Sequence, residues 1–174
     1  LLLVLHLSYA FVTLGFLAIA SAALELIAPV SALHVLTVGA IAFLVGHIVA
    51  IALYLRHRRP ALGAADKALA VVLIPLSVAL AYLLPTDRVL ASGAALYTAG
   101  LAAMAVCAWI CRFPRALTGL GAMMFVAADL LIFGRAGPLA GQVWAGFAVW
   151  GLYFFGQVLM CLGGVRGLAR ERRL

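Results

Sequence analysis

Uninterrupted apolar runs of about 20 residues dominate this sequence and limit what it can fold into. Hydrophobic residues fill 68% of the 174 positions, and charged residues fill only 10%. A soluble globule of this size carries about 25% charged residues, so a soluble fold is excluded. As helices, the runs are long enough to cross a hydrocarbon core of about 30 Å, and they lack the alternating pattern of a transmembrane barrel. We therefore expect an all-α, polytopic membrane helical bundle.

Charged clusters and breaks rich in Pro and Gly divide the apolar runs into about six predicted transmembrane helices. The predicted helices cover residues 1–28, 30–56, 67–84, 90–112, 117–134 and 140–166. Pro75 predicts a kink in the third helix, which a bundle can tolerate. We assign residues 1–166 to one transmembrane bundle and residues 167–174 to a basic cytoplasmic tail, helical and close to the anionic membrane surface. Because Leu1 stands inside an apolar run, we expect the sequence to begin within a longer protein.

Basic residues are concentrated on one side of the predicted bundle. Ten of them follow the second, fourth and last helices, namely Arg56, Arg58, Arg59, Lys67, Arg112, Arg115, Arg166, Arg170, Arg172 and Arg173. Only Arg88 and Arg135 lie on the opposite side. Because loops rich in Lys and Arg stay in the cytoplasm, we expect both ends of this chain to be cytoplasmic. The same asymmetry explains the net charge of +7, so no nucleic-acid partner is expected.

A short set of polar side chains lies within the apolar helices, where ionisable groups are costly and therefore candidates for function. The set comprises His6, Tyr9, Glu25, His34, His47, Tyr97, Asp129, Gln142, Tyr153 and Gln157. Counting about 1.5 Å per residue from the helix ends sorts six of them into two layers. The layer near the non-cytoplasmic face holds Glu25, His34, Tyr97 and Asp129, and the layer in the cytoplasmic half holds His47 and Gln157.

Asp129 is the strongest functional candidate among these residues. Its neighbours on both sides, residues 123–128 and 130–133, are wholly apolar. The Asp129 side chain therefore needs a buried partner or a carboxyl group that stays protonated. Glu25 lies close to a helix end, where a solvated interfacial carboxylate is as good an interpretation as a functional one.

The remaining candidates have simpler interpretations beside the functional one. An interfacial anchor is the favoured role for His34. A structural hydrogen bond between helices, worth under about 1 kcal/mol, would explain His47 and Gln157. Cys107 and Cys111 share a helix face, but further metal ligands are missing nearby, so packing in the lipid phase is the favoured interpretation.

Four segments, in order along the chain, resemble conserved motifs of the YhhN family, the integral-membrane lysoplasmalogenases. Residues 121–131, GAMMFVAADLL, resemble its "GallFxxSDxll" motif, which contains the acid at Asp129. Residues 43–47, FLVGH, look like its "FLxxH" segment, and residues 96–104 are similar to its "LY…M" span. Residues 153–157, YFFGQ, resemble its "YxxxQ" segment. The resemblance covers roughly residues 20–166.

The sequence also departs from the family pattern at several positions. The family usually has eight helices, so the six predicted here suggest that the first two are missing. Ala128 stands where the family motif has Ser, and Ala50 replaces a common Tyr. The family's "GD" motif has no literal match, and Glu25 is the acid nearest to its expected place. These departures concern catalytic competence more than the fold.

The resemblance implies hydrolysis of the vinyl ether bond of a lysoplasmalogen, with release of a fatty aldehyde. Such a reaction needs an acid that is protonated near neutral pH and a group that stabilises the cation or activates water. Asp129 is the candidate acid, and Glu25 is the candidate base or cation stabiliser. We expect the lysophospholipid substrate to contact His47, Tyr97, Tyr153 and Gln157. No metal or other cofactor is expected, and the implied location is the bacterial inner (cell) membrane.

Two other interpretations remain open. A non-catalytic lipid-binding protein could share this fold, and the missing Ser and "GD" motif favour that interpretation. Separately, parts of the first 45 residues or so look like the NnrS family of haem and copper membrane proteins, which would make His6 and His34 metal or haem ligands.

Overall fold

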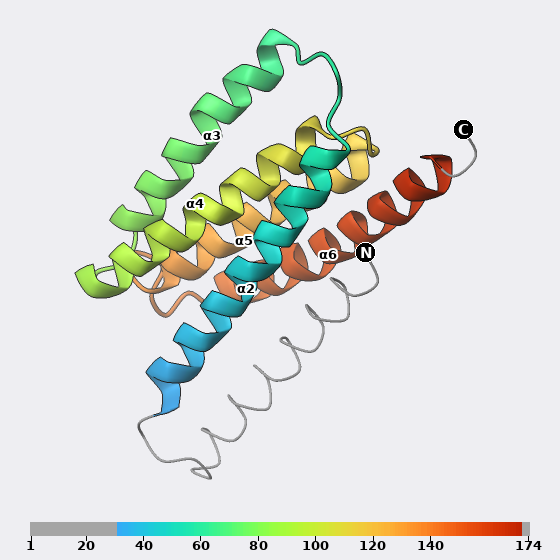
Figure 1. The fold of residues 1–174 in the computed structure, drawn as a ribbon. Coiled ribbons are helices and arrows are strands. Elements are labelled where there is room, and N and C mark those ends of the chain that lie inside the picture. Colours follow the sequence, from blue (N-terminus) through green and yellow to red (C-terminus); the bar gives the residue numbers. More distant parts are fainter. Residues whose placement is uncertain (1–30, 172–174) are drawn as a thin grey trace. The chain divides into compact units, whose positions relative to one another are not determined.

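The computed structural model describes the backbone of residues 31–171 and the side chains of residues 43–170. In this part of the chain every regular secondary-structure element is a helix (Figure 1). The helices are α2 (Ser31–Arg56), α3 (Ala64–Leu83), α4 (Arg88–Ile110), α5 (Leu120–Arg135) and α6 (Val143–Glu171). A π-helical segment, Arg115–Gly119, leads directly into α5.

The helices agree with five of the six predicted transmembrane segments to within a few residues. Among the described residues, four stretches are long and apolar enough to cross a membrane: Ala64–Leu83, Arg88–Ile110, Arg115–Arg135 and Val143–Arg170. The all-α membrane fold is therefore confirmed, and the chain is an integral membrane protein. The first predicted helix, residues 1–28, lies outside the described residues.

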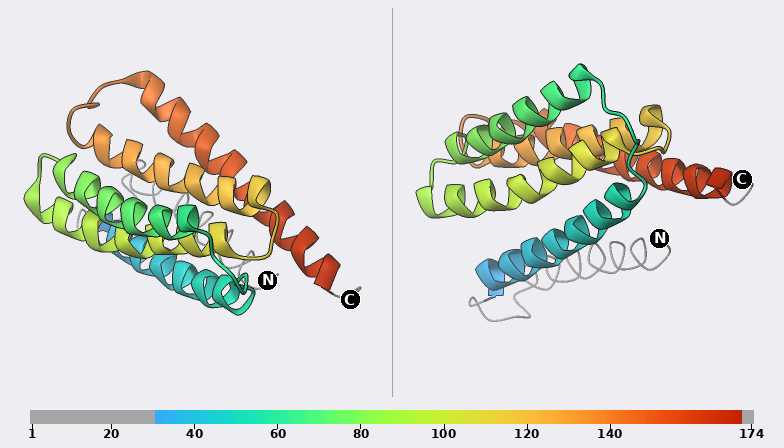
Figure 2. Two further views of the ribbon diagram at one scale, coloured as in Figure 1. Left: turned by 90° about the horizontal axis from the view of Figure 1, so that it is seen from above. Right: turned by 45° about the horizontal axis from the view of Figure 1, so that its top comes forward.

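The described residues fall into two units that divide within α2, one up to Ala50 and the other from Ile51 onward. In the second unit, α3 packs on α4, α4 on α5, and α5 on α6 (Figure 2). Pro75 lies within α3, which continues through it to Leu83. α6 continues to Glu171, so residues 167–171 form the helical extension expected at the C-terminal end.

The loops at the basic end of the second unit are joined by backbone pairing and by a buried carboxylate. The Arg59 amide donates to the Ile110 carbonyl at 3.2 Å, which ties the loop after α2 to the end of α4. Asp66, 6% exposed, binds Arg115 at 2.6 Å and Arg59 at 3.5 Å. The loops that carry these basic residues therefore meet at one end of the helices, as the predicted topology requires.

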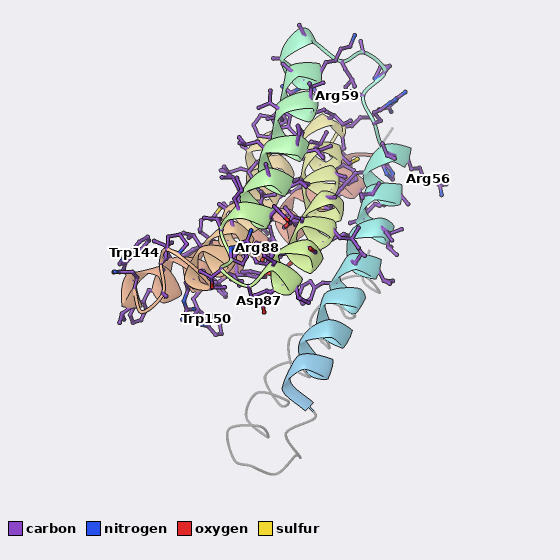
Figure 3. The ribbon with its side chains drawn as sticks, turned by 90° about the vertical axis from the view of Figure 1, so that its left-hand side faces the viewer. Arg56, Arg59, Asp87, Arg88, Trp144 and Trp150 are labelled. Atoms are coloured by element: carbon purple, nitrogen blue, oxygen red, sulfur yellow. The ribbon has the colours of Figure 1, made fainter. Side chains whose placement is uncertain are left out.

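The loops at the other end also meet. The Thr86 amide and hydroxyl both donate to the Ala136 carbonyl at 3.1 Å, which links the α3–α4 loop to the end of α5. Asp87 caps α4, because its Oδ1 accepts from the Val89 amide at 2.8 Å. Figure 3 shows Asp87 and Arg88 at the end of α3 that is remote from Arg59.

Helices α5 and α6 approach closely where two glycines face each other. A Cβ atom on Gly121 would lie 2.6 Å from the Gly156 carbonyl oxygen, and one on Gly156 would lie 2.9 Å from the Gly121 oxygen. Real Cβ atoms essentially never come that close. Small residues allow such backbone contact in lipid, where close packing replaces the hydrophobic effect as the source of helix association.

Candidate functional site

Three polar side chains from adjacent helices meet inside the second unit. Tyr97 comes from α4, Asp129 from α5 and Tyr153 from α6. The Tyr153 hydroxyl donates a hydrogen bond of 2.6 Å to Asp129 Oδ1. Tyr97 interacts with both of the other side chains. We call these three residues the Asp129 cluster.

The α5–α6 contact brings Tyr153 to Asp129. Gly121, Phe125 and Asp129 follow one another at four-residue spacing, so they share the face of α5 that meets α6. Gly121 allows the backbones to touch, and the Phe125 ring lies 4.5 Å from the Tyr153 ring, centroid to centroid. One turn further along α5, the Asp129 carboxyl is then within reach of the Tyr153 hydroxyl.

The Asp129 carboxyl is asymmetric in its surroundings. Only 3% of the residue is exposed, and Oδ1 accepts the hydrogen bond from Tyr153. Oδ2 is buried and has no hydrogen-bond partner in the described part of the chain. An unpaired buried oxygen is costly, and protonation of Oδ2 reduces that cost because it leaves a neutral group. The site therefore presents a carboxyl with one oxygen held in place and the other left for a proton or a ligand.

The Asp129 cluster contains three of the predicted site residues. Gln157 lies one turn beyond Tyr153 on α6, half-buried and without a hydrogen bond to other described residues. His47 belongs to the first unit, where it is buried and its ring centroid lies 6.2 Å from that of Phe43. Glu25 lies outside the described residues.

The other polar candidates are either exposed or outside the described side chains. Gln142 is exposed in the loop before α6, and the side chain of His34 is not among those described. Among the described residues, no group of three or more His, Cys, Asp or Glu side chains is arranged to hold a metal ion. His6, a ligand in the haem or copper interpretation, lies outside them.

Sequence reasoning missed two kinds of polar residue near the membrane-spanning helices. Thr98 and Thr118 are fully buried, and each hydroxyl oxygen lacks a hydrogen-bond partner in the described part of the chain. Asp66 was overlooked because it follows a basic cluster and resembles an ordinary loop acid in the sequence. Its partners Arg59 and Arg115 come from two different loops, so the sequence around Asp66 carries no local signal of this pairing.

Fold and site together define a polytopic helical membrane protein with a buried carboxyl–phenol cluster. A model of the YhhN family matches residues 2–164. The chain belongs to the YhhN family. This match covers residues 2–45 as well, a region that includes the segments similar to the NnrS family. Comparison with curated proteins and with solved structures gives no significant match.

Proposed function

We propose that this chain is an integral-membrane hydrolase that cleaves the vinyl ether bond of lysoplasmalogens. The products are a fatty aldehyde and a glycerophospho head group. The observation that carries the proposal is the buried Asp129 carboxyl, which combines a fixed Oδ1 with an unpaired Oδ2. Membership of the YhhN family supports the same activity, because the family is known for lysoplasmalogenases.

The first step of the reaction needs a proton donor beside the outer carbon of the vinyl ether. Protonated Asp129 would transfer its Oδ2 proton to the outer carbon of the vinyl ether, which converts the C=C–O group into an oxocarbenium ion. Water then attacks the cationic carbon and loses a proton to the Asp129 carboxylate. The resulting hemiacetal breaks its bond to the glycerol oxygen. The hemiacetal hydroxyl loses its proton to form the aldehyde, and the glycerol oxygen takes up one proton, so the count balances. One water is consumed, and the acid is regenerated.

The neighbouring phenols have supporting roles in this scheme. The Tyr153 hydroxyl donates to Oδ1, so it orients the carboxyl and stabilises the carboxylate that forms when the proton leaves. Tyr97 interacts with both partners from the α4 side. We retain Glu25 as the proposed base or cation stabiliser; in this scheme, where Asp129 takes the proton from water, its part is to stabilise the cation. We retain His47 and Gln157 as proposed substrate contacts.

The Ala at position 128 weakens the enzyme proposal less than the sequence suggested. Family members have Ser there, and its hydroxyl would assist the neighbouring carboxylate. Ala128 is fully buried, with no accessible surface. The carboxyl of Asp129 nevertheless has a hydroxyl partner, because Tyr153 supplies one from α6. A serine is therefore not required to hold Oδ1 in place.

The placement of the protein in its membrane is part of the proposal. The basic residues around Asp66 gather at one end of the helices, and the Asp129 cluster lies toward the other end. By the positive-inside rule, the basic end and both termini face the cytoplasm of a bacterial cell. The Asp129 cluster then lies in the outer half of the cell membrane.

Aldehyde release from a defined substrate tests the proposed activity against the lipid-binding alternative. The purified protein is incubated in lipid nanodiscs with an alkenyl lysophospholipid and, separately, with its saturated alkyl analogue. We expect aldehyde only from the alkenyl lipid. Recovery of both lipids bound and chemically unchanged would instead support a non-catalytic binder. Visible absorption or stoichiometric metal in the purified protein would support the haem or copper interpretation.

A further inference from the structure

Arg135 ends α5, and its guanidinium group lies against the first turn of α6. A Cβ atom built on Gly146 would lie 3.7 Å from Arg135 Nη1, 3.8 Å from Cζ and 3.9 Å from Nη2. All three of its nearest neighbours are therefore guanidinium atoms. A side chain at position 146 would therefore meet the guanidinium at ordinary van der Waals distance, so the cation packs beside this glycine of α6.

No carboxylate among the described residues forms a salt bridge with Arg135. Asp87, the acid in the nearby loop, uses its Oδ1 to cap α4. The situation of Arg88 differs, since its guanidinium donates to the Tyr82 and Pro85 carbonyls and lies 5.4 Å from the Tyr82 ring centroid. At this end of the helices, Arg135 is thus an exposed cation without a carboxylate partner among the described residues, so it is available to an anionic ligand.

The position of Arg135 relative to the Asp129 cluster is regular. Gly146 and Tyr153 are seven positions apart on α6, so they share one face and are separated by about 10.5 Å along its axis. On α5, Arg135 follows Asp129 by six positions, or about 9 Å. Along the helix axes, the guanidinium therefore lies about two turns closer to the α5–α6 loop than the carboxyl does. It lies on the side of α6 that carries Tyr153.

This spacing matches a lysophospholipid. Seven bonds separate the phosphorus atom from the outer vinyl carbon, and an extended chain of seven bonds spans about 9 Å at roughly 1.25 Å per bond. A phosphate at Arg135 would consequently place the vinyl ether at the depth of Asp129. Exposed Trp144 and Trp150 flank Gly146 on α6, as aromatic residues do at a membrane interface (Figure 3).

We propose that Arg135, packed against Gly146, binds the phosphate of the lysolipid head group and thereby sets the depth of the vinyl ether bond in the membrane. Guanidinium groups suit this task because their parallel N–H donors match phosphate oxygens. The inference rests on the proposed function for the identity of the substrate, but phosphate binding can be measured without turnover. Arg135 is a substrate-binding residue here, distant from the reacting atoms.

The test compares lipids with and without phosphate on three variants. Binding is measured by titrating an alkyl lysophospholipid, which cannot be hydrolysed, and an uncharged alkylglycerol of the same chain length. Turnover is measured with the two matching alkenyl lipids. The variants are Arg135→Gln, Gly146→Leu, whose side chain would occupy the place of the guanidinium, and Arg88→Gln as a control that removes a charge at the same end.

We expect Arg135→Gln to weaken lysophospholipid binding and to raise its KM by about 10- to 100-fold, with kcat changed little. Alkylglycerol binding should stay within about twofold, and Arg88→Gln should leave both lipids unaffected. Gly146→Leu should reproduce the Arg135→Gln result although it keeps the charge. A wild-type protein that binds both lipids equally would overturn the inference, and so would equal losses for both lipids in Arg135→Gln. Phosphate-selective binding without aldehyde release would support the inference and refute the proposed activity.

Discussion

Replacing Tyr153 by Phe removes one hydroxyl and leaves the rest of the Asp129 cluster in place. The Phe ring keeps its contact with Phe125, whose centroid lies 4.5 Å away, so the packing of α5 on α6 should persist. What disappears is the 2.6 Å hydrogen bond to Asp129 Oδ1. A hydrogen bond to a charged group contributes about 1.5–3 kcal/mol, and the carboxyl becomes charged when it gives up its proton.

The expected loss in rate follows from that energy. If the bond is strongest to the carboxylate formed in the transition state, kcat/KM for the alkenyl lysophospholipid falls by about 10- to 150-fold. Aldehyde release is assayed in nanodiscs, and lipid binding by the same protein should change by less than about threefold. Tyr82→Phe is the matched control, because Tyr82 is 44% exposed and lies on α3, outside the Asp129 cluster. A folded Tyr153→Phe protein with kcat/KM within twofold of wild type would refute the role given to this hydroxyl.

Two further predictions concern stability, measured by thermal unfolding of the protein in detergent. Gly156→Ala should destabilise it by about 1–3 kcal/mol, because the new Cβ would lie 2.9 Å from the Gly121 oxygen. Gly151→Ala is the control and should leave the stability unchanged, because the space around Gly151 is open. Equal destabilisation by the two substitutions would contradict the close contact. Asp66→Asn should cost about 1–2 kcal/mol through its two arginine partners, which are partly exposed. Lys67→Gln is the neighbouring control, and an unchanged midpoint for Asp66→Asn would contradict the ion-pair interpretation.

The positions of the helices could be predicted from the sequence because apolar length and interrupting charges determine where a chain crosses a membrane. The start of α3 shows the limit of this reasoning. We predicted a start at Lys67, because charged residues mark a helix end, but α3 begins at Ala64. Asp66 is accommodated in the first turn because it accepts from the Gly63 amide at 3.3 Å and pairs with Arg115 from another loop. Arg115 is distant in the sequence, and a hydrogen bond to the Gly63 backbone amide cannot be read from the types of residue present.

The ends of two other helices depend on similarly local details. α4 begins at Arg88, two residues before the predicted start, because Asp87 caps its first amide groups. α6 begins at Val143, three residues after the predicted start, because the loop before it continues through Gly141. That glycine has a φ of +76°, a left-handed conformation that other residues rarely adopt.

The depth of the candidate site could be predicted from the sequence, but which side chains pair within it could not. Counting residues from helix ends placed Tyr97 and Asp129 in one layer, and they do interact. Which face of each helix points inward depends on packing, and here the contact of Gly121 with Gly156 fixes the rotation that brings Tyr153 to Asp129. Hydrophobic periodicity carries little of that information in a membrane helix, since nearly every face is apolar.

The central claim is that Asp129 supplies the proton that opens the vinyl ether. Its most direct test is aldehyde release by Asp129→Asn in nanodiscs, measured beside the binding of the non-hydrolysable alkyl lysophospholipid. Asparagine retains the size of the side chain and an oxygen that can accept from Tyr153, but it has no acidic proton to give. We expect aldehyde release to fall at least about 1,000-fold while the lipid remains bound with nearly wild-type affinity. Full hydrolysis by Asp129→Asn would show that the proton comes from another group.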